Sequence, residues 1–375
     1  MRDFPRIAII GGGPGGLTLA RLLHIKGLSA TVFESDAGSA ARGPGGSLDL
    51  HSGSGLAALE AAGLMDAFDK VARPEDQSVR LYDRAGVCVY DDGDRPHAGR
   101  PEIDRGQLRD LLLASLPSGQ VQWNARVSRV EALTDGFRVH TRHGAEDFDL
   151  IVGAEGAWSK TRHLLTDEAP TYTGVTAVDM HIADIDRAYP DLARLVGRGK
   201  IFALADSKAL IAQRNAGGKV HVYVALRTPE PGLAGFDPTD SQAARALIAA
   251  HLDGWAAELV AFIDAAADDM QARPIHAFDP PPRWPHRPGV TLLGDAAHVM
   301  SPFAGEGVNN AMLDALCLAQ AIASDDWRAG IRAYEAQMFD RILPSAQASA
   351  DNMAAFLSPD GLANAQFIFR SHEPA

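Results

Sequence analysis

The feature that most constrains this chain is a glycine-rich turn near its N-terminus. It follows the β-branched run Arg6–Ile10, which predicts a buried strand, and precedes residues 17–26, which have helical spacing and are closed by Gly27. A second predicted strand, Ala30–Phe33, then ends at Glu34. A strand, a glycine turn, a helix, a strand and an acid within about 30 residues are the βαβ fingerprint of dinucleotide binding.

Each glycine of the G-x-G-x-x-G pattern has a separate task. Gly11 permits the tight turn, Gly13 lets a pyrophosphate approach the backbone, and Gly16 lets the helix pack closely on the strand. The helix N-terminus presents free N–H groups to the phosphates, and Glu34 is placed to accept from a ribose hydroxyl. The alternative is a glycine-rich turn of an unrelated α/β protein. The predicted cofactor contacts of this segment are Gly11, Gly13, Pro14, Gly15, Gly16 and Glu34.

The composition excludes several classes of function. The net charge is -13 and no basic block is present, which argues against a nucleic-acid partner. The two cysteines, Cys88 and Cys317, are far apart, so they predict neither a disulfide framework nor the close redox pair of a disulfide reductase. No H-E-x-x-H or similar cluster is present, and we expect no metal site.

The hydrophobic runs bear on location. The first strand begins within a few residues of Met1, without a basic segment and a long apolar run before it, so no secretory signal is predicted. Five glycines and a proline interrupt the apolar residues 7–23, and no run approaches about 20 unbroken apolar residues. We therefore expect a cytoplasmic protein with no stable membrane association, and we take it to be a monomer.

The sequence pattern in the middle of the chain is typical of a β-sheet. Strand-like segments separated by turn residues predict an antiparallel sheet with one packed face and one open face. Residues 78–90 predict a hairpin, residues 121–130 a strand, and the alanine-rich residues 241–267 a helix. The segments of the antiparallel sheet are 175–182, 200–205, 209–213 and 219–226.

A second motif, GVTLLGDAAHVMSPFAGEGVNN, occupies residues 289–310. Asp295 follows a buried strand, at the carboxyl end where ligands bind in open α/β sheets. Pro302, Gly305 and Gly307 then lead into a helix, whose N-terminus stabilises negative charge. Such an end suits the N1/C2=O edge of a reduced flavin. The alternative is an ordinary capped helix after a loop.

These motifs resemble those of a known family. The glycine turn with Glu34, the segment 155–162 and the GDAAH…PFAGEGVNN segment are similar to those of single-component, class A flavin monooxygenases of the para-hydroxybenzoate hydroxylase fold. The family's middle motif is roughly Asp-Gly-x-x-Ser-x-x-Arg, and Glu155 replaces its aspartate here. The resemblance spans essentially the whole chain. It implies FAD as the cofactor and NADPH or NADH as a transient electron donor.

Further segments, including residues 45–64, 101–113 and 301–316, resemble the tetracycline-degrading flavin monooxygenases. This implies that Arg105 contacts the flavin and Arg109 the phosphate or ribose region of FAD. Asp295 would bind the ribityl or pyrophosphate portion. The remaining implied cofactor contacts are Ser47, Asp49, Pro302, Gly305, Gly307 and Val308. The implied substrate contacts are Asp179, Lys200, Phe202, His221, Pro302, Phe303 and Ala304.

Structural roles remain open for several of these residues. Arg105 and Arg109 lie one helical turn apart and could be an exposed pair. His221 matches a histidine of the tetracycline-degrading enzymes, yet it could be a core histidine of a strand. Asp179 and Lys200 replace a glutamine and an arginine of those enzymes.

The predicted fold class is α/β, with a Rossmann-type FAD-binding domain, an inserted antiparallel-sheet substrate domain and a C-terminal helix. A single G-x-G-x-x-G argues against a second, nicotinamide-binding domain of this type. The FAD-binding domain is predicted to comprise residues 1–75, 106–172 and 283–325, and the substrate domain residues 76–105 and 173–282. Residues 326–375 are predicted to form a C-terminal helical segment.

The resemblance implies that a tetracycline-like or other polycyclic aromatic substrate is hydroxylated with dioxygen, through a flavin C4a-hydroperoxide. No protein nucleophile is then required, and the protein keeps the site dry and the substrate close. The alternatives are hydroxylation of a smaller phenol in secondary metabolism or catabolism, and a flavin-binding protein without catalysis. A halogenase is disfavoured because no W-x-W-x-I-P motif occurs. A role in antibiotic resistance is implied by the resemblance alone.

Overall fold

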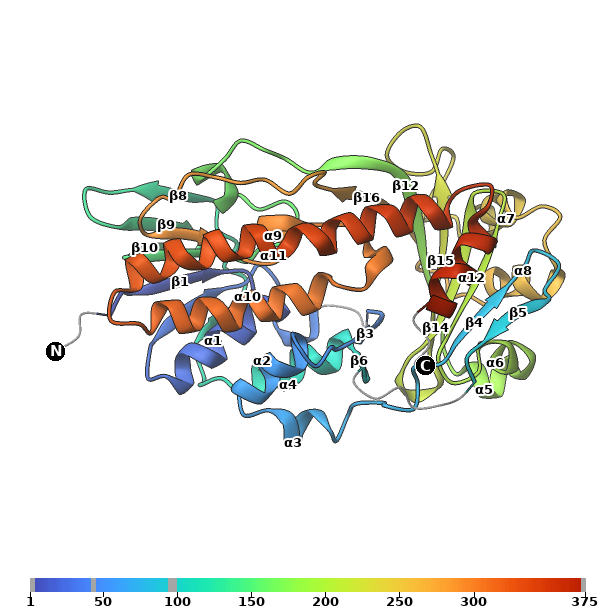
Figure 1. Cartoon of the computed structure of the whole chain (residues 1–375), viewed down its shortest axis with the longest axis horizontal. Helices are drawn as coiled ribbons and strands as arrows, with labels where there is room; N and C mark the ends of the chain where they lie inside the picture. Colours follow the sequence, from blue (N-terminus) through green and yellow to red (C-terminus); the bar gives the residue numbers. More distant parts are fainter. Residues whose placement is uncertain (1–3, 42–44, 94–99, 372–375) are drawn as a thin grey trace.

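The computed structural model describes residues 4–41, 45–93 and 100–371, and two β-sheets organise it (Figure 1). The first sheet is parallel and has the strand order β17-β11-β1-β2-β7. Because its strands are parallel, their carboxyl ends meet at one edge, where the glycine turn and Gly294 lie. Its strands are β1 (Ile7–Ile10), β2 (Ala30–Phe33), β7 (Val121–Gln122), β11 (Leu150–Gly153) and β17 (Val290–Leu292).

Helices cover one face of this sheet, and Ile7 and Ile9 of β1 pack there in a large apolar core. The other face packs on a three-stranded sheet through residues such as Phe137 and Phe148. The helices are α1 (Pro14–Ile25), α2 (Gly55–Ala61), α3 (Met65–Phe68), α4 (Arg105–Ala114), α9 (Asp295–His298) and α10 (Gly307–Ile322). The three-stranded sheet contains β8 (Arg129–Ala132), β9 (Phe137–Thr141) and β10 (Gly144–Phe148), and β3 (Ser47–Asp49) pairs with β6 (Glu102–Asp104).

The second sheet has the order β16-β12-β15-β14-β13-β4-β5. Its neighbouring strands are antiparallel except β13 and β4, which pair in parallel. The four segments predicted to form an antiparallel sheet pair with one another in this way, as β12, β15, β14 and β13. One face packs on helices through Val178, Val222 and Ile263. The strands are β4 (Val79–Tyr82), β5 (Cys88–Asp91), β12 (Thr171–Ile182), β13 (Lys200–Ala205), β14 (Lys208–Arg214), β15 (Val220–Arg227) and β16 (Gln271–Ala277).

Two predicted elements are wrong in extent. The strand predicted at 121–130 stops at Gln122, because Asn124 adopts a φ of 53°, and the chain resumes in β8. The helix predicted at 241–267 is interrupted at Gly254, whose φ is 78°, a conformation that a helix cannot contain.

Helices lie on the packed face of the second sheet. They are α5 (Ile185–Ala188), α6 (Pro190–Val196), α7 (Ser241–His251) and α8 (Ala257–Asp264).

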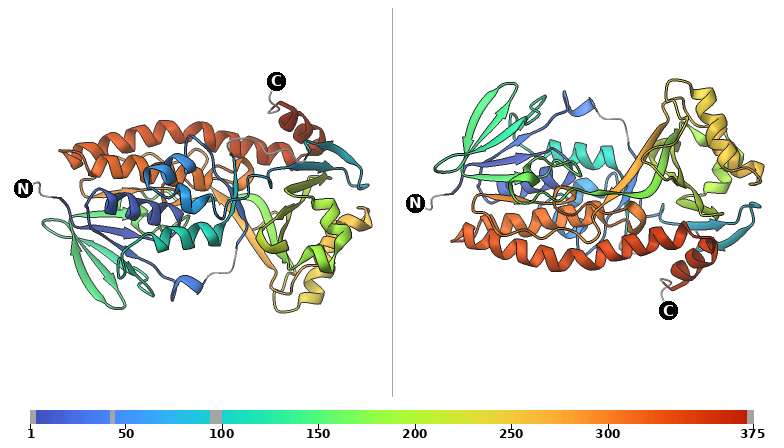
Figure 2. Two further views of the ribbon diagram at one scale, coloured as in Figure 1. Left: turned by 90° about the horizontal axis from the view of Figure 1, so that it is seen from below. Right: turned by 90° about the horizontal axis from the view of Figure 1, so that it is seen from above.

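A long C-terminal helix connects the two parts of the molecule. Helix α11 (Trp327–Phe356) runs beside α10 and continues to the second sheet, as Figures 1 and 2 show. It is followed by α12 (Gly361–Ser371), which lies within the predicted C-terminal helical segment, although a separate helix was not predicted there. Phe356 and Ala365 of these helices pack with Leu81 and Leu204 of the sheet. The sheet face predicted to be open is therefore partly covered.

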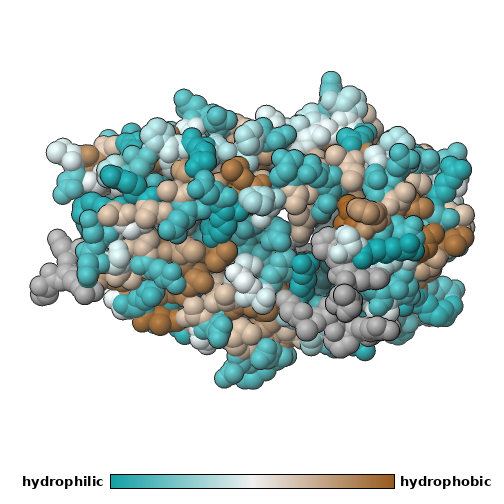
Figure 3. Space-filling model, viewed as in Figure 1, coloured by the Kyte–Doolittle hydropathy of each residue, from teal (hydrophilic) through white to brown (hydrophobic). Residues whose placement is uncertain are grey.

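The outer surface is mixed in character. On the face shown in Figure 3, hydrophilic residues predominate and hydrophobic residues form small, separate patches. Among the described helices, none has the length and apolar character needed to cross a bilayer. The domain boundaries predicted from the sequence are kept as a proposal, with β4 and β5 belonging to the second sheet.

Candidate active site

A cavity of about 1540 Å³ is lined by residues of both sheets. This volume exceeds the roughly 300–1,000 Å³ of a pocket for one small ligand, so the cavity has room for a cofactor and a second molecule. One end contains Gly11–Gly15, Glu34 and Asp295. The other end is formed by apolar side chains of the second sheet and of the C-terminal helices.

The glycine turn has the geometry of an anion site. Gly11 has a φ of 112°, and a Cβ there would lie 2.3 Å from the Ala154 carbonyl oxygen. By contrast, a Cβ at Gly13 would meet no protein atom within 4 Å. Gly13 is also the N-cap of α1, and no side chain caps this helix. The first-turn N–H groups therefore face open space suited to a phosphate.

Glu34 holds the turn in place. It is 2% exposed and accepts hydrogen bonds from the N–H groups of Gly12 (2.8 Å) and Asp36 (2.9 Å). Its Oε2 lies 3.9 Å from Nη2 of Arg109. Glu34 also lines the cavity, so the acid lies beside the turn, as the sequence predicts. The contact of Glu34 with a ribose hydroxyl stays a prediction.

Arg105 and Arg109 face different spaces. Arg105 lines the main cavity, whereas Arg109 lines a separate cavity of about 520 Å³. Arg109 is 5% exposed and donates to Asp36 Oδ2 at 2.8 Å and to the Ser39 carbonyl at 3.2 Å. The alternative of a solvated arginine pair is therefore wrong for Arg109.

The middle motif supports the turn that carries Asp295. Arg162 is 2% exposed and donates from Nε to the Ala296 carbonyl (2.8 Å) and from Nη2 to the Asp295 carbonyl (3.3 Å). The substituted Glu155 accepts from the N–H and the hydroxyl of Thr161, at 2.8 and 2.7 Å. A glutamate at this position thus still closes the turn before Arg162.

Asp314, which the sequence analysis did not single out, anchors the GDAAH segment. It is fully buried on α10, and its Oδ2 accepts from the Gly294 N–H (2.8 Å) and contacts His298 Nε2 (2.7 Å). Arg341 of α11 pairs with its other oxygen. One carboxylate therefore joins the end of β17 to two helices. No local pattern reveals this role, since its partners lie 16 to 27 residues away.

The start of α10 also fits the cofactor. Gly305 has a φ of 70°, and no side chain caps the helix that begins at Gly307. The Asn309 amide donates to the Asp49 carbonyl (2.8 Å) and accepts from the His51 N–H (2.9 Å). This places β3 beside the helix N-terminus, where negative charge is stabilised. Predicted cofactor residues at this end of the cavity are Ser47, Asp49, Pro302, Gly305, Gly307 and Val308, all of which line it.

His51 lies between two carboxylates at this point. Its Nε2 is 3.3 Å from Asp49 Oδ2 and its Nδ1 is 3.4 Å from Glu306 Oε1. Burial lowers the pKa of His51, but the two carboxylates outweigh burial and raise it to about 9. Lys200 and His51 outweigh burial at Asp49 and lower its pKa well below its usual range. The imidazole is therefore charged at neutral pH.

The stability that His51 contributes should depend on pH. A raised folded-state pKa gives stability that is complete below the ordinary histidine pKa of 6.5 and is lost as pH rises through about 9. We expect wild type to exceed His51→Asn by about 2 kcal/mol near pH 6, after allowance for partial solvent screening. Urea unfolding should show this gap closing by about pH 10. A gap that does not change with pH would contradict the ion-pair account.

Aromatic side chains line the other end of the cavity. Phe202 of β13 lies 6.0 Å from Phe356 and 5.3 Å from Phe369, measured between ring centroids. Phe303 lies 6.2 Å from Phe356. Tyr223 of β15 adds a hydroxyl to this wall, and burial raises its pKa to about 12. The wall can therefore hold a flat ring system while it excludes water.

The predicted substrate residues separate into two groups. Lys200, Phe202 and the segment Pro302–Ala304 line the cavity. Asp179 and His221 are absent from its lining: Asp179 Oδ1 lies 3.1 Å from His221 Nδ1, and Oδ2 accepts from Arg273 at 2.8 Å. Their role toward a substrate stays a prediction. The sequence analysis missed Tyr223, although it lies two residues from His221 on the same strand face.

Comparison with known proteins identifies the family. Residues 5–326 match the model of an FAD binding domain. The chain is 33% identical over 368 residues to the monooxygenase penA of Penicillium thymicola, and the match covers 84% of each chain. The chain belongs to the FAD-dependent monooxygenase family. The predicted cofactor, FAD, and the predicted enzyme class are thereby confirmed.

Solved structures confirm the predicted fold. HpxO of Klebsiella pneumoniae, complexed with FAD and uric acid, has a TM-score of 0.80 and 23% identity, and the match covers 98% of this chain and 92% of that chain. The tetracycline destructase Tet(51) has a TM-score of 0.72 and 18% identity, with 98% and 96% covered. At these identities the likeness concerns the fold, and it favours no substrate.

Proposed function

We propose that the protein is an NAD(P)H-dependent FAD monooxygenase that hydroxylates a polycyclic aromatic compound, such as one of tetracycline type. The observation that carries this proposal is the aromatic wall joined to the glycine-lined end in one cavity. Phe202, Phe356 and Phe369 come from three elements and surround one apolar space. A substrate there would lie next to the helix N-terminus at Gly307.

Bound FAD supplies the redox chemistry, accepting electrons from NAD(P)H and activating dioxygen. This chain's residues bind and orient. The glycine turn and α1 would hold the pyrophosphate, and Asp295 with the α10 N-terminus would hold the ribityl chain and the ring edge. The aromatic wall excludes water from the space where substrate and ring meet. No protein nucleophile is required in this scheme.

A smaller ring compound is the second candidate. The structural neighbour HpxO is complexed with uric acid, which shows that this fold can hold a compact heteroaromatic molecule. In our protein, Lys200 and Tyr223 offer polar contacts that such a molecule could use. Hydroxylation of a small phenol in catabolism or secondary metabolism would need the same cofactor site.

Stimulated NAD(P)H oxidation distinguishes the two candidates. The FAD-loaded protein is mixed with anhydrotetracycline or with simple phenols, and consumption of NADPH and of NADH is followed. We expect polycyclic compounds to stimulate consumption and to gain one oxygen atom by mass spectrometry. Stimulation by simple phenols alone would refute the polycyclic proposal and leave the second candidate.

A further inference from the structure

The cavity face of the second sheet carries a polar row beside an apolar row. Lys200 of β13 lies opposite Gln213 of β14, and both side chains line the cavity. Side chains two residues apart on a strand share a face, so the neighbouring row points into the same cavity. That neighbouring row is Phe202, Ile211 and Tyr223. A ring held on the apolar row therefore has polar partners along one edge.

Glu102 meets this polar row from β6. Its carboxyl group is 1% exposed and lines the cavity. Oε2 accepts from Ser47 Oγ at 2.5 Å and from Gln213 Nε2 at 3.1 Å. Glu102 Oε1 lies 3.5 Å from Lys200 Nζ, which is the one hydrogen-bond partner of Oε1 within the described part of the chain. The two charged groups thus face each other at the polar edge of the cavity.

The Glu102–Lys200 pair is incompletely satisfied as a purely structural contact. A separation of 3.5 Å is at the outer limit of a hydrogen bond, whereas a buried ion pair is stabilising only with close geometry. An ammonium group has three donors, and among the described residues Lys200 Nζ has this one partner. Both groups therefore retain hydrogen-bonding capacity for a molecule in the cavity.

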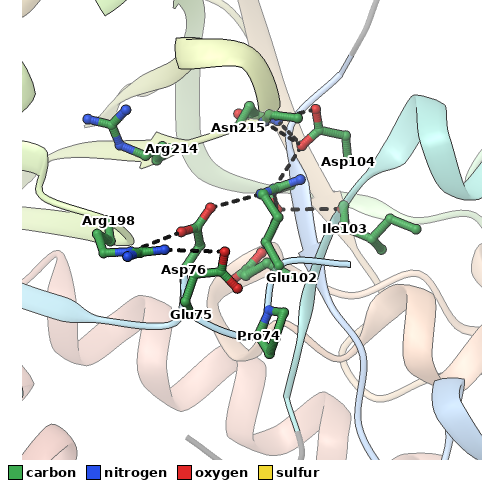
Figure 4. A network of polar contacts seen from close by, with 12 residues as sticks. Pro74, Glu75, Asp76, Glu102, Ile103, Asp104, Arg198, Arg214 and Asn215 are labelled. Atoms are coloured by element: carbon green, nitrogen blue, oxygen red, sulfur yellow. Dashed lines mark hydrogen bonds and ion pairs between the residues drawn. The ribbon is translucent and has the colours of Figure 1, made fainter. Parts of the chain in front are cut away.

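Other residues hold β6 in place. The Asn215 amide donates to Asp104 Oδ1 at 2.9 Å, and Arg73 pairs with the same carboxylate at 2.8 Å. Figure 4 shows this network, in which Arg198 also lies against Asp76. Since Asp104 anchors the strand to the second sheet, the pair formed by Glu102 is not needed for that purpose.

We propose that Glu102 and Lys200 bind and ionise a hydroxyl group of the substrate, which makes that substrate a phenol or an enol. The substrate O–H bond breaks, and its proton forms a new O–H bond at Glu102 Oε1. The electron pair stays on the substrate oxygen, and the Lys200 ammonium holds the resulting oxyanion. The proposal rests on the proposed function, because an ionised ring is more electron-rich and thus more readily hydroxylated.

The surroundings of Glu102 set the pH at which it can act. Burial raises its pKa above the ordinary value, more than the nearby Lys200 lowers it, and Asp49 raises it further. Ser47, Gln213 and Arg73 complete the groups that face it from neighbouring strands. Ionisation of a bound phenol should therefore increase with pH through this raised pKa, and Glu102→Gln should abolish that limb of the profile.

The experiment measures the ionisation of a bound chromogenic phenol. FAD-loaded wild type is titrated with 4-nitrophenol, and with 4-nitroanisole as the matched ligand without an ionisable hydroxyl. We expect bound 4-nitrophenol to have the phenolate spectrum at pH values where the free compound is neutral. Glu102→Gln and Lys200→Met should each lower the bound phenolate fraction at least tenfold. With a phenol or enol that the enzyme hydroxylates, Glu102→Gln should lower kcat/KM about 100-fold.

Controls separate this role from folding and from the proposed function. Glu335→Gln removes a carboxylate that is equally buried and pairs with His286 outside the cavity, and it should leave the bound spectrum unchanged. FAD content and circular dichroism verify that each variant is folded. Three results would overturn the proposal. They are equal binding of 4-nitrophenol and 4-nitroanisole, failure of 4-nitrophenol to bind, and an unchanged fraction of bound phenolate in both Glu102→Gln and Lys200→Met. These readouts need no turnover, so they remain decisive if NAD(P)H oxidation is never stimulated.

Discussion

Replacing Gly13 by valine is expected to leave the protein folded and to weaken FAD binding strongly. A Cβ at Gly13 meets no protein atom within 4 Å, and its φ of -80° suits any residue. The branched side chain would instead occupy the space before the α1 N-terminus, where we place the pyrophosphate. The measurements are FAD content after purification with excess FAD, and circular dichroism of the same sample. We expect at least a 100-fold weaker Kd for FAD in this variant, equivalent to about 2.7 kcal/mol.

Gly11→Val is the matched variant, two residues away in the same turn. Its Cβ would lie 2.3 Å from the Ala154 carbonyl oxygen, and a φ of 112° strains any side chain. This variant should lose stability as well as FAD. If Gly13→Val retains FAD at wild-type affinity, the pyrophosphate does not lie at this turn.

Replacing Asp314 by alanine is expected to lower the free energy of unfolding by about 3–5 kcal/mol. The change leaves the Arg341 guanidinium and the buried Gly294 N–H without their carboxylate partner. His298, which is 2% exposed, loses its partner at the same time. Urea unfolding of the FAD-free protein measures the loss without a contribution from cofactor binding. Because Asp314 supports the turn that carries Asp295, FAD affinity should fall as well.

Asp340→Ala provides the comparison for Asp314. Its carboxylate pairs with Arg283 at 3.0 Å, but both side chains are more than half exposed. A solvated pair of this kind contributes at most about 1 kcal/mol. Equal destabilisation by the two substitutions would contradict the view that Asp314 is the buried centre of this junction.

The parts of the site that could be predicted from sequence are those determined by short segments. Gly11 and Gly16 are required by backbone geometry within one turn, so the pattern alone located the turn at which we place the pyrophosphate. Asp295 follows a buried strand and could be placed at the sheet edge for the same reason. Lys200 and Phe202 were found through family resemblance, and both line the cavity.

The rest depends on contacts between distant segments. Glu102 meets Lys200 and Gln213 across 98 and 111 residues, and no periodicity connects them. Asp314 lies on the buried face of an apolar helix, where the hydrophobic pattern of the sequence predicts an apolar residue and reveals no partner for a carboxylate. Likewise, the contacts of Asp179 with His221 and with Arg273 follow from the register of β12, β15 and β16, which no local pattern reveals.

The most direct test of the central claim uses isotopically labelled dioxygen. The FAD-loaded protein is given NADPH or NADH, a panel of polycyclic and simple phenols, and dioxygen labelled with oxygen-18. If the protein is an aromatic monooxygenase, mass spectrometry will find one labelled oxygen atom in a product, formed in proportion to the NAD(P)H consumed. Consumption of NAD(P)H with hydrogen peroxide as the sole oxygen-derived product, and no label in any compound of the panel, would contradict it.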